Sequence, residues 1–233
     1  MATSSKKKGK EAEVVDNVQE VLSKSEQFIE KNQKMLFLIV GAVVLIVCAI
    51  LVFRNFYLIP RETEAENQIH KAQTYFERDS FQLALTGNEE FLGFEAIKDQ
   101  YSMTKTAKLA NAYIGLCYKE LEKYDEAIKY LKDFDADDEM ISPAIIVSVG
   151  DCYVETGKIK EAIDYFLKAA DKAKNDLVSP FALKKAAIAY EELHEYEKAE
   201  NVYRQIKEKY YNSNEAYNID KFISRAEALK AAK

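Results

Sequence analysis

The chain has 233 residues, of which 48% are hydrophobic and 31% are charged, and its formal net charge is −6. Only seven glycines and three prolines occur in this length, so the composition favours helices over strands. Residues 54–233 carry 26 basic and 33 acidic side chains. A domain of this charge repels phosphate backbones, which argues against nucleic acid as a partner.

Residues 1–34 are predicted to form a cytoplasmic tail that contains an amphipathic helix. Residues 1–10 hold four lysines and are expected to be disordered. After residue 11, apolar side chains recur at the three- and four-residue spacing of one helix face. They are Val14, Val18, Val21, Leu22, Phe28 and Ile29. This helix either rests on the inner leaflet or contacts a membrane partner, and the pattern fits both interpretations.

Residues 35–53 form an uninterrupted apolar run, bracketed by Lys34 and Arg54. Because a helix rises about 1.5 Å per residue, the run just crosses a hydrocarbon core of about 30 Å. Phe56 and Tyr57 follow at the depth of the membrane interface. The sequence therefore predicts one transmembrane helix, which places the lipid bilayer among the partners of the chain.

Three other interpretations of the apolar run are weaker. A cleaved signal peptide has a shorter apolar core and small residues at its cleavage site, which residues 54–57 do not offer. A lipoprotein signal ending at Cys48 would require a small residue where Val47 stands. A buried core helix usually shows a polar face, and this run has none.

The flanking charges predict the orientation of the span. Seven lysines precede the run, whereas only Arg54 and Arg61 follow it closely. The positive-inside rule then keeps the tail in the cytoplasm and sends the long C-terminal part across the membrane. Residues 54–62 are expected to link the span to that part.

Residues 63–214 contain about four copies of one pattern, the first of them degenerate. Its tyrosine column is Tyr75, Tyr118, Tyr153 and Tyr190, and its alanine column is Ala84, Ala127, Ala162 and Ala199. A further column of small residues is Gly115, Gly150 and Ala187. The alanines lie 43, 35 and 37 residues apart, and a period near 34 residues is typical of the tetratricopeptide repeat.

A steric argument explains these columns. Small residues let the two antiparallel helices of a hairpin approach closely, and the tyrosines fill the space between consecutive hairpins. The pattern resembles the tetratricopeptide repeat, whose hairpins stack into a superhelix. We therefore predict an all-α protein, in which a single transmembrane helix precedes an α-solenoid. Residues 215–233 are expected to cap the last hairpin, which would otherwise expose its stacking face.

Residues 87–105 are an insertion between the first and second copies. They contain Phe91, Phe94 and Ile97. We expect the insertion to extend a helix and to pack its aromatic side chains against the next hairpin. The alternative is an exposed docking patch.

No catalytic, cofactor or metal site is predicted. Cys117 and Cys152 share a column with Thr74 and Ala189, so they are interpreted as small structural side chains, and Cys48 lies in the apolar run. His70 and His194 are far apart, and no phosphate loop or nucleophile motif occurs. An enzyme, a cofactor and a small-molecule substrate are therefore not expected.

The first helices of the hairpins are predicted to line a concave groove that binds an extended or helical peptide segment. Its candidate residues are Leu109, Ala112, Leu116, Lys119, Ala144, Val147, Asp151, Val154, Phe181, Lys184, Ile188 and Glu191. The carboxylate-clamp subset of tetratricopeptide domains has Lys, Asn and Arg at such positions. Ala112 and Leu116 stand there in this chain, so capture of a free chain terminus is not predicted.

The layout resembles the ancillary subunit of the Sec translocon, a bacterial inner-membrane protein with a periplasmic tetratricopeptide domain. It is similar, more closely, to tetratricopeptide proteins of Bacteroidetes, and the likeness covers nearly the whole chain. The stretches that carry it are residues 28–32 (FIEKN), 84–88 (ALTGN), 91–94 (FLGF), 150–153 (GDCY) and 219–228 (IDKFISRAEA).

This resemblance implies three protein partners: the translocon channel, a membrane-anchored periplasmic chaperone and nascent secreted chains. Two other assignments fit the same layout. One is a scaffold of another cell-envelope machine. The other is an organellar import receptor whose repeats face the cytosol.

Overall fold

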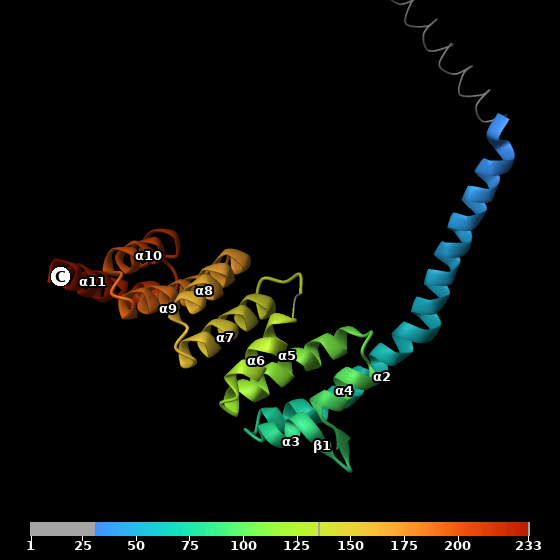
Figure 1. Cartoon of the computed structure of the whole chain (residues 1–233), viewed down its shortest axis with the longest axis horizontal. Helices are drawn as coiled ribbons and strands as arrows, with labels where there is room; N and C mark the ends of the chain where they lie inside the picture. Colours follow the sequence, from blue (N-terminus) through green and yellow to red (C-terminus); the bar gives the residue numbers. More distant parts are fainter. Residues whose placement is uncertain (1–30, 135, 233) are drawn as a thin grey trace, which may run out of the picture. The chain divides into compact units, whose positions relative to one another are not determined.

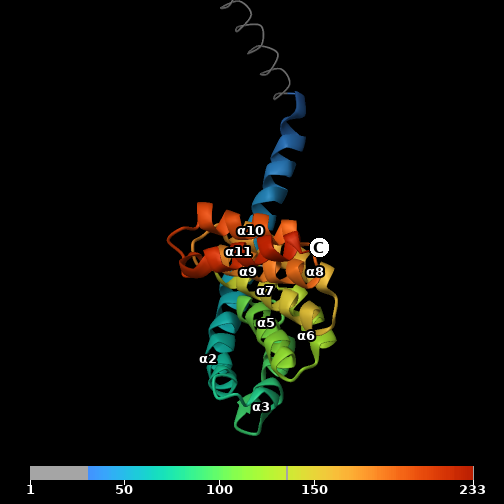
Figure 2. The same cartoon turned by 90° about the vertical axis from the view of Figure 1, so that its left-hand side faces the viewer.

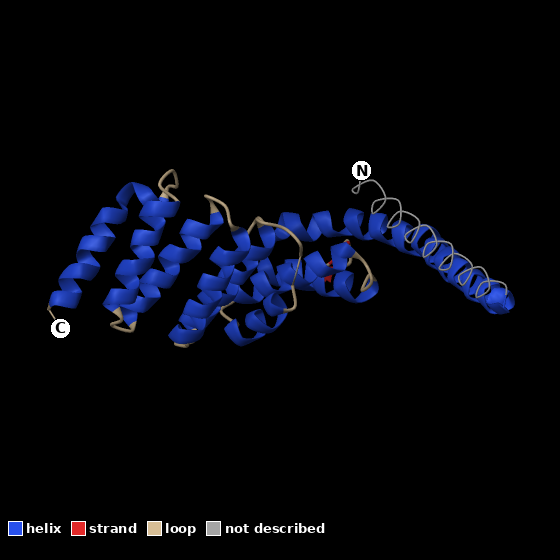
Figure 3. Ribbon diagram, turned by 90° about the horizontal axis from the view of Figure 1, so that it is seen from above, coloured by secondary structure: helices blue, strands red, loops and turns tan. Residues whose placement is uncertain are grey.

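The computed structural model of the chain describes residues 31–134 and 136–232. The amphipathic helix predicted in the tail therefore lies almost entirely outside the described residues. The chain divides into two compact units, Met1–Ile59 and Pro60–Lys233. In the part that the structure describes, helices account for nearly all regular structure, and the only sheet is one short two-stranded hairpin (Figure 3).

The apolar run lies in the helical stretch Lys31–Phe76. An 18-residue window of this stretch has a mean hydropathy of 3.4, and none of the window is buried. Large apolar side chains such as Leu38 and Leu45 are 72% and 71% exposed. By length and composition, this helix could cross a membrane.

Residues 54–62, which were expected to be a linker, are helical. A π-helical turn, Arg54–Leu58, leads into α2, Ile59–Phe76. The turn ends two residues before Pro60, whose missing N–H interrupts the regular α-helical hydrogen-bond ladder. The segment contains no glycine, and Pro60 is tolerated in the first turn of α2, so the helix continues through it.

The second unit continues with a short hairpin region and then a series of longer helices (Figure 1). The first part comprises α3 Phe81–Thr86, β1 Gly87–Asn88, β2 Phe91–Leu92 and α4 Phe94–Gln100. The series comprises α5 Lys105–Glu120, α6 Tyr124–Lys132, α7 Ile141–Glu155, α8 Ile159–Ala173, α9 Val178–Glu192 and α10 Tyr196–Lys209. It ends with a 3₁₀ turn, Glu215–Asn218, and α11, Ile219–Ala231.

The glycine column allows close contact within a hairpin. A Cβ added at Gly115 would lie 2.6 Å from Cγ of Leu131, and one added at Gly150 would lie 2.5 Å from Cε1 of Phe166. Real Cβ atoms do not approach other atoms this closely, so glycine lets α5 meet α6, and α7 meet α8, at these points. The alanine column is fully buried on the facing helices.

Each hairpin turns at the same place, four residues after its tyrosine. Asp79, Glu122, Gly157 and His194 all have left-handed backbone conformations, with φ between 57° and 71°. In each case the backbone N–H of the next residue bonds the tyrosine carbonyl oxygen, at 2.8 to 2.9 Å. The recurrence at Asp79 shows that α2 and α3 follow the same plan as the later repeats.

Two members of the tyrosine column lie between core clusters. Tyr118 and Tyr153 each border two clusters of buried side chains. Each also contacts a tyrosine of its own hairpin. Tyr118 stacks on Tyr130 at a centroid distance of 5.5 Å, and Tyr153 packs at a tilt against Tyr165 at 5.2 Å. These rings therefore join one hairpin to the next.

The insertion packs Phe94 against α5 and Phe91 against Tyr75 of α2, but it does not extend a helix. It forms the antiparallel pair β1–β2 and the separate helix α4. Phe94 is fully buried and stacks on Tyr113 of α5 at 4.7 Å. Gly87 and Gly93 explain the difference, because the backbones of the hairpin cross too closely there for any Cβ. Near this region α2 lies alongside α5 (Figure 2).

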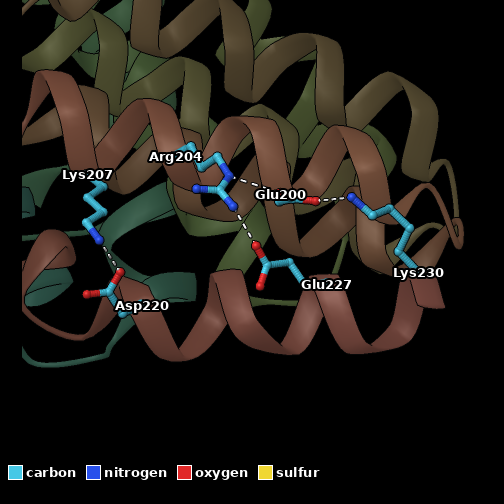
Figure 4. Close-up of polar contacts among 6 residues, drawn as sticks. All are labelled: Glu200, Arg204, Lys207, Asp220, Glu227 and Lys230. Atoms are coloured by element: carbon cyan, nitrogen blue, oxygen red, sulfur yellow. Dashed lines mark hydrogen bonds and ion pairs between the residues drawn. The ribbon is translucent and has the colours of Figure 1, made fainter. Parts of the chain in front are cut away.

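Helix α11 covers α10 and the end of α9. Its buried residues are Ile219, Ile223 and Ala226. Around this contact, charged side chains pair across the helices: Arg204 with Glu227 at 2.5 Å, and Lys207 with Asp220 at 2.6 Å (Figure 4). Glu200 accepts from both Arg204 and Lys230.

Candidate functional site

Capping side chains fix the starts of the three first helices, α5, α7 and α9. Thr104 Oγ1 accepts from the backbone N–H of Ala107 at the start of α5. Asp138 accepts from three backbone N–H groups at the start of α7, and Asn175 Oδ1 from the N–H of Val178 at 2.8 Å. Burial tends to raise the pKa of Asp138, but these hydrogen bonds hold it below its usual range.

The start of α5 receives a second cap from α2. The Glu62 carboxylate accepts from the backbone N–H of Lys105 at 2.7 Å and from that of Thr106 at 2.9 Å. It also accepts from the Thr106 hydroxyl at 2.8 Å. Burial acts to raise the pKa of Glu62, but these bonds lower it overall. The cap therefore ties the first hairpin to the second.

Two adjoining cavities lie along α5, α7 and α9. The first, of about 480 Å³, lies at the C-terminal ends of the three helices; we call it the acidic cavity. The second, of about 380 Å³, lies nearer their N-terminal ends between α7 and α9; we call it the apolar cavity. Asp151 borders both. We refer to the two cavities together as the groove.

Seven of the twelve predicted groove residues border these cavities. Lys119, Asp151, Val154 and Ile188 line the acidic cavity, and Ala144, Val147 and Phe181, with Asp151 again, line the apolar cavity. Ile188 and Phe181 are 44% and 43% exposed. The groove therefore presents apolar side chains to solvent.

The other five predicted residues have contacts elsewhere. Ala112 is buried in a cluster with residues of α7, and Leu109 and Leu116 pack against core clusters. The Lys184 ammonium lies 4.8 Å from the centroid of the Phe222 ring, and Glu191 pairs with Arg225. Both Phe222 and Arg225 belong to α11, which takes the place that a further first helix would have.

Sequence reasoning missed Lys185 and Glu192, which border the acidic cavity in place of their neighbours Lys184 and Glu191. It also missed Glu120 and Glu155. The sequence did contain a pattern that could have predicted the glutamates, since a glutamate follows every tyrosine of the repeat column by two residues.

Charges in the acidic cavity are only partly paired. Lys185 Nζ lies 2.9 Å from Asp151 Oδ1, and Lys119 Nζ lies 3.3 Å from Glu120 Oε1. Burial, followed by the carboxylates of Glu155 and Glu122, raises the pKa of the Tyr124 hydroxyl at the cavity wall. The cavity is therefore a region of negative potential.

The two cysteines of the repeats are free and buried. Burial raises the pKa of Cys117 to about 12 and that of Cys152 to about 11. Both thiols stay protonated at neutral pH, and they pack as small apolar side chains. Among the described residues, no three His, Cys, Asp or Glu side chains are grouped as metal ligands.

Residues 110–134 and 144–175 match the tetratricopeptide repeat family. These two segments carry tetratricopeptide repeats. No curated protein matches the chain. Solved structures that share the fold include the TPR-like repeats of a protein named as a putative kinesin light chain from Podosopora anserina, and a variant of that protein with one substitution. Both are 13% identical over 74% of this chain and 89% of theirs, with TM-scores of 0.57 and 0.56.

These findings support an all-α solenoid of tetratricopeptide type. Such arrays are typically scaffolds without catalytic activity, and their stacked hairpins present extended concave binding surfaces. The repeats therefore indicate that the chain is a protein–protein interaction adaptor with protein partners.

Proposed function

We propose that the chain is a membrane-anchored adaptor that binds protein segments in its groove. We propose further that it is an accessory subunit of the Sec translocon in a bacterial inner membrane. There it would link the channel to periplasmic chaperones or to secreted chains. The groove along α5, α7 and α9 is the observation on which this proposal rests.

The shape of the groove suits a peptide segment. The two cavities adjoin at Asp151 and extend over three consecutive hairpins, so a bound segment would contact several repeats at once. Exposed Leu177 and Phe181 in the apolar cavity offer anchoring surface for apolar side chains. A concave surface with exposed apolar side chains is typical of an interaction site.

The proposed anchor is the helix over residues 35–53. Its apolar side chains are exposed throughout the 18-residue window. A bilayer around this helix would remove that apolar surface from water, which is favourable by about 25 cal/mol per Å². With the tail lysines in the cytoplasm, the repeats would lie in the periplasm.

Crosslinking in intact cells of the source organism, followed by purification and mass spectrometry, tests the partner. Translocon and chaperone subunits are expected among the crosslinked proteins. The double variant Phe181→Ser, Ile188→Ser should lose them, because both side chains border the groove. Met103→Ser is the matched control, since Met103 is 62% exposed and borders neither cavity.

Other outcomes assign the chain differently. Recovery of another envelope machine in place of the translocon would contradict the translocon assignment and favour a scaffold. Protease added outside the inner membrane should digest the repeats and spare the tail. Repeats that resist such protease, and are instead cleaved from the cytosolic side, would support an import receptor.

A further inference from the structure

Each first helix of the three regular hairpins ends on a glutamate. Glu120, Glu155 and Glu192 are the last residues of α5, α7 and α9, and all three border the acidic cavity. A helix C-terminus carries partial negative charge, so a carboxylate there lowers stability and a lysine raises it. Neither α7 nor α9 has a basic residue in its last turn. This charge arrangement opposes stability at the ends of α7 and α9, whereas Lys119 in the last turn of α5 pairs with Glu120.

The same cavity leaves three carboxylates without a cationic partner. Five carboxylates and two lysines line it, and each lysine pairs with one carboxylate. Within residues 31–134 and 136–232, no ion pair neutralises Glu122, Glu155 or Glu192. A cation entering the cavity would relieve both their mutual repulsion and their repulsion by the helix ends.

Apolar surface adjoins this negative charge. Leu177 and Phe181 in the apolar cavity are 58% and 43% exposed, and Ile188 in the acidic cavity is 44% exposed. Asp151 stands where the two cavities meet. A ligand that follows the groove would thus meet a negative region and an apolar region in succession.

We propose that the groove selects basic amphipathic protein segments. Lysine or arginine side chains would enter the acidic cavity, and neighbouring apolar side chains would enter the apolar cavity. Acidic segments would be rejected by like-charge repulsion. This inference rests on the proposed function, since it requires that the groove binds protein segments at all.

Fluorescence anisotropy with designed peptides tests the charge preference. The probe is a fluorescein-labelled peptide of about 15 residues that alternates lysine with leucine, and its counterpart has glutamate in place of lysine. The full chain is held in nanodiscs of zwitterionic lipid, so that the bilayer does not attract the basic probe. The lysine peptide should bind at least about tenfold more tightly, and its affinity should fall as the salt concentration rises.

A matched pair of triple variants locates the effect. Glu120→Gln, Glu155→Gln, Glu192→Gln should weaken binding of the lysine peptide about tenfold, because three carboxylates leave the cavity. The control changes Glu126, Glu161 and Glu197 to Gln. These residues lie in the first turns of α6, α8 and α10, are exposed, and border neither cavity. The control removes the same net charge and should keep wild-type affinity.

Thermal unfolding separates this effect from loss of structure. The cavity variant should melt a few degrees higher than the wild type, since it removes negative charge from helix C-termini. The control should melt lower, since it removes favourable negative charge from helix N-termini. Weaker binding by a more stable variant cannot result from unfolding.

Three results would overturn the charge preference: undiminished binding of the lysine peptide by the cavity variant, equal binding of the glutamate peptide, or no binding of either probe. The groove function itself is judged by the crosslinking experiment. Partners lost on Phe181→Ser, Ile188→Ser but kept by the cavity variant would uphold a binding groove that is not selective for basic segments.

Discussion

The insertion region and the regular repeats both need close contacts between elements, but they achieve them with different atoms. In the regular repeats, a Cβ at Gly115 or Gly150 would first meet a side chain, that of Leu131 or Phe166. In the insertion, a Cβ at Gly93 would lie 2.2 Å from the carbonyl oxygen of Leu85. Side chains can adjust by rotation, whereas a backbone crossing cannot. The insertion should therefore tolerate change less well than the repeats.

The third regular hairpin shows that the glycine column can hold a larger residue when the facing side chain also changes. Ala187 occupies the glycine column there, and Tyr203 stands where the other hairpins have Leu131 and Phe166. Both residues of this pair are fully buried, and the Tyr203 ring packs against Phe222 of α11. The same repeat position accepts a Cβ once the facing side chain is arranged around it.

The largest expected effect is that of Gly93→Ala in the insertion. The added methyl group would contact backbone atoms at 2.2 to 2.4 Å, so we expect the free energy of unfolding to fall by about 3 kcal/mol. Urea denaturation measures it. Gly157→Asn is the control, because a Cβ at Gly157 meets nothing within 4 Å and the equivalent turns hold Glu122 and His194. Equal effects of both substitutions would contradict the backbone argument.

Gly150→Ala should have the next largest effect. The free energy of unfolding should fall by about 2 kcal/mol, because the Phe166 ring must move. Adding Phe166→Leu makes room for the methyl group, so the double variant should be about 1 kcal/mol more stable than the sum of the two single effects predicts. A double-mutant cycle in urea measures this coupling. A coupling near zero would show that the close contact is not what constrains this position.

Glu62→Gln tests the connection between the first hairpin and the array. Loss of the charged cap at α5 should destabilise the fold by about 1 kcal/mol at neutral pH. Because the folded pKa of Glu62 lies below its ordinary value of 4.5, this stabilisation is present above that pH and disappears as the pH falls through the folded value. Denaturation at neutral and acidic pH should show the wild type and the variant converging in acid.

Asp138→Asn provides the comparison for this prediction. Asp138 caps α7 from its own connecting segment, whereas Glu62 reaches α5 from α2. Hydrogen exchange should therefore speed up in α2 for Glu62→Gln only. Unchanged exchange in α2 would argue against Glu62 as a link between the hairpins.

The smallest effect is expected at the C-terminal cap. Lys207 and Asp220 pair at 2.6 Å, but their side chains are 54% and 73% exposed. Water screens such a pair, so Asp220→Asn should change the free energy of unfolding by less than about 0.5 kcal/mol. A change above about 1 kcal/mol in thermal or urea unfolding would mean that the ion pairs of Figure 4, and not only apolar burial, hold α11 in place.

The spacing of small residues and tyrosines was enough to predict the regular hairpins. It did not predict the β1–β2 hairpin, because the glycines that close it, Gly87 and Gly93, have no counterpart in the repeat pattern. Nor did it predict the left-handed turn residues. Glu122 and His194 adopt that conformation without being glycine, since the hydrogen bonds that end the helix compensate for the strain.

The sequence by itself determined which segments form hairpins. The two helices of each hairpin meet at a point where only a small residue fits, so small residues recur at the same position of every copy. Only the tertiary structure decided which side of α9 borders the groove. There α11 takes Lys184 and Glu191 as packing and ion-pair partners, which leaves Lys185 and Glu192 to the acidic cavity. Adjacent residues on a helix point about 100° apart, so the neighbour packed against a helix determines which of them a partner can reach.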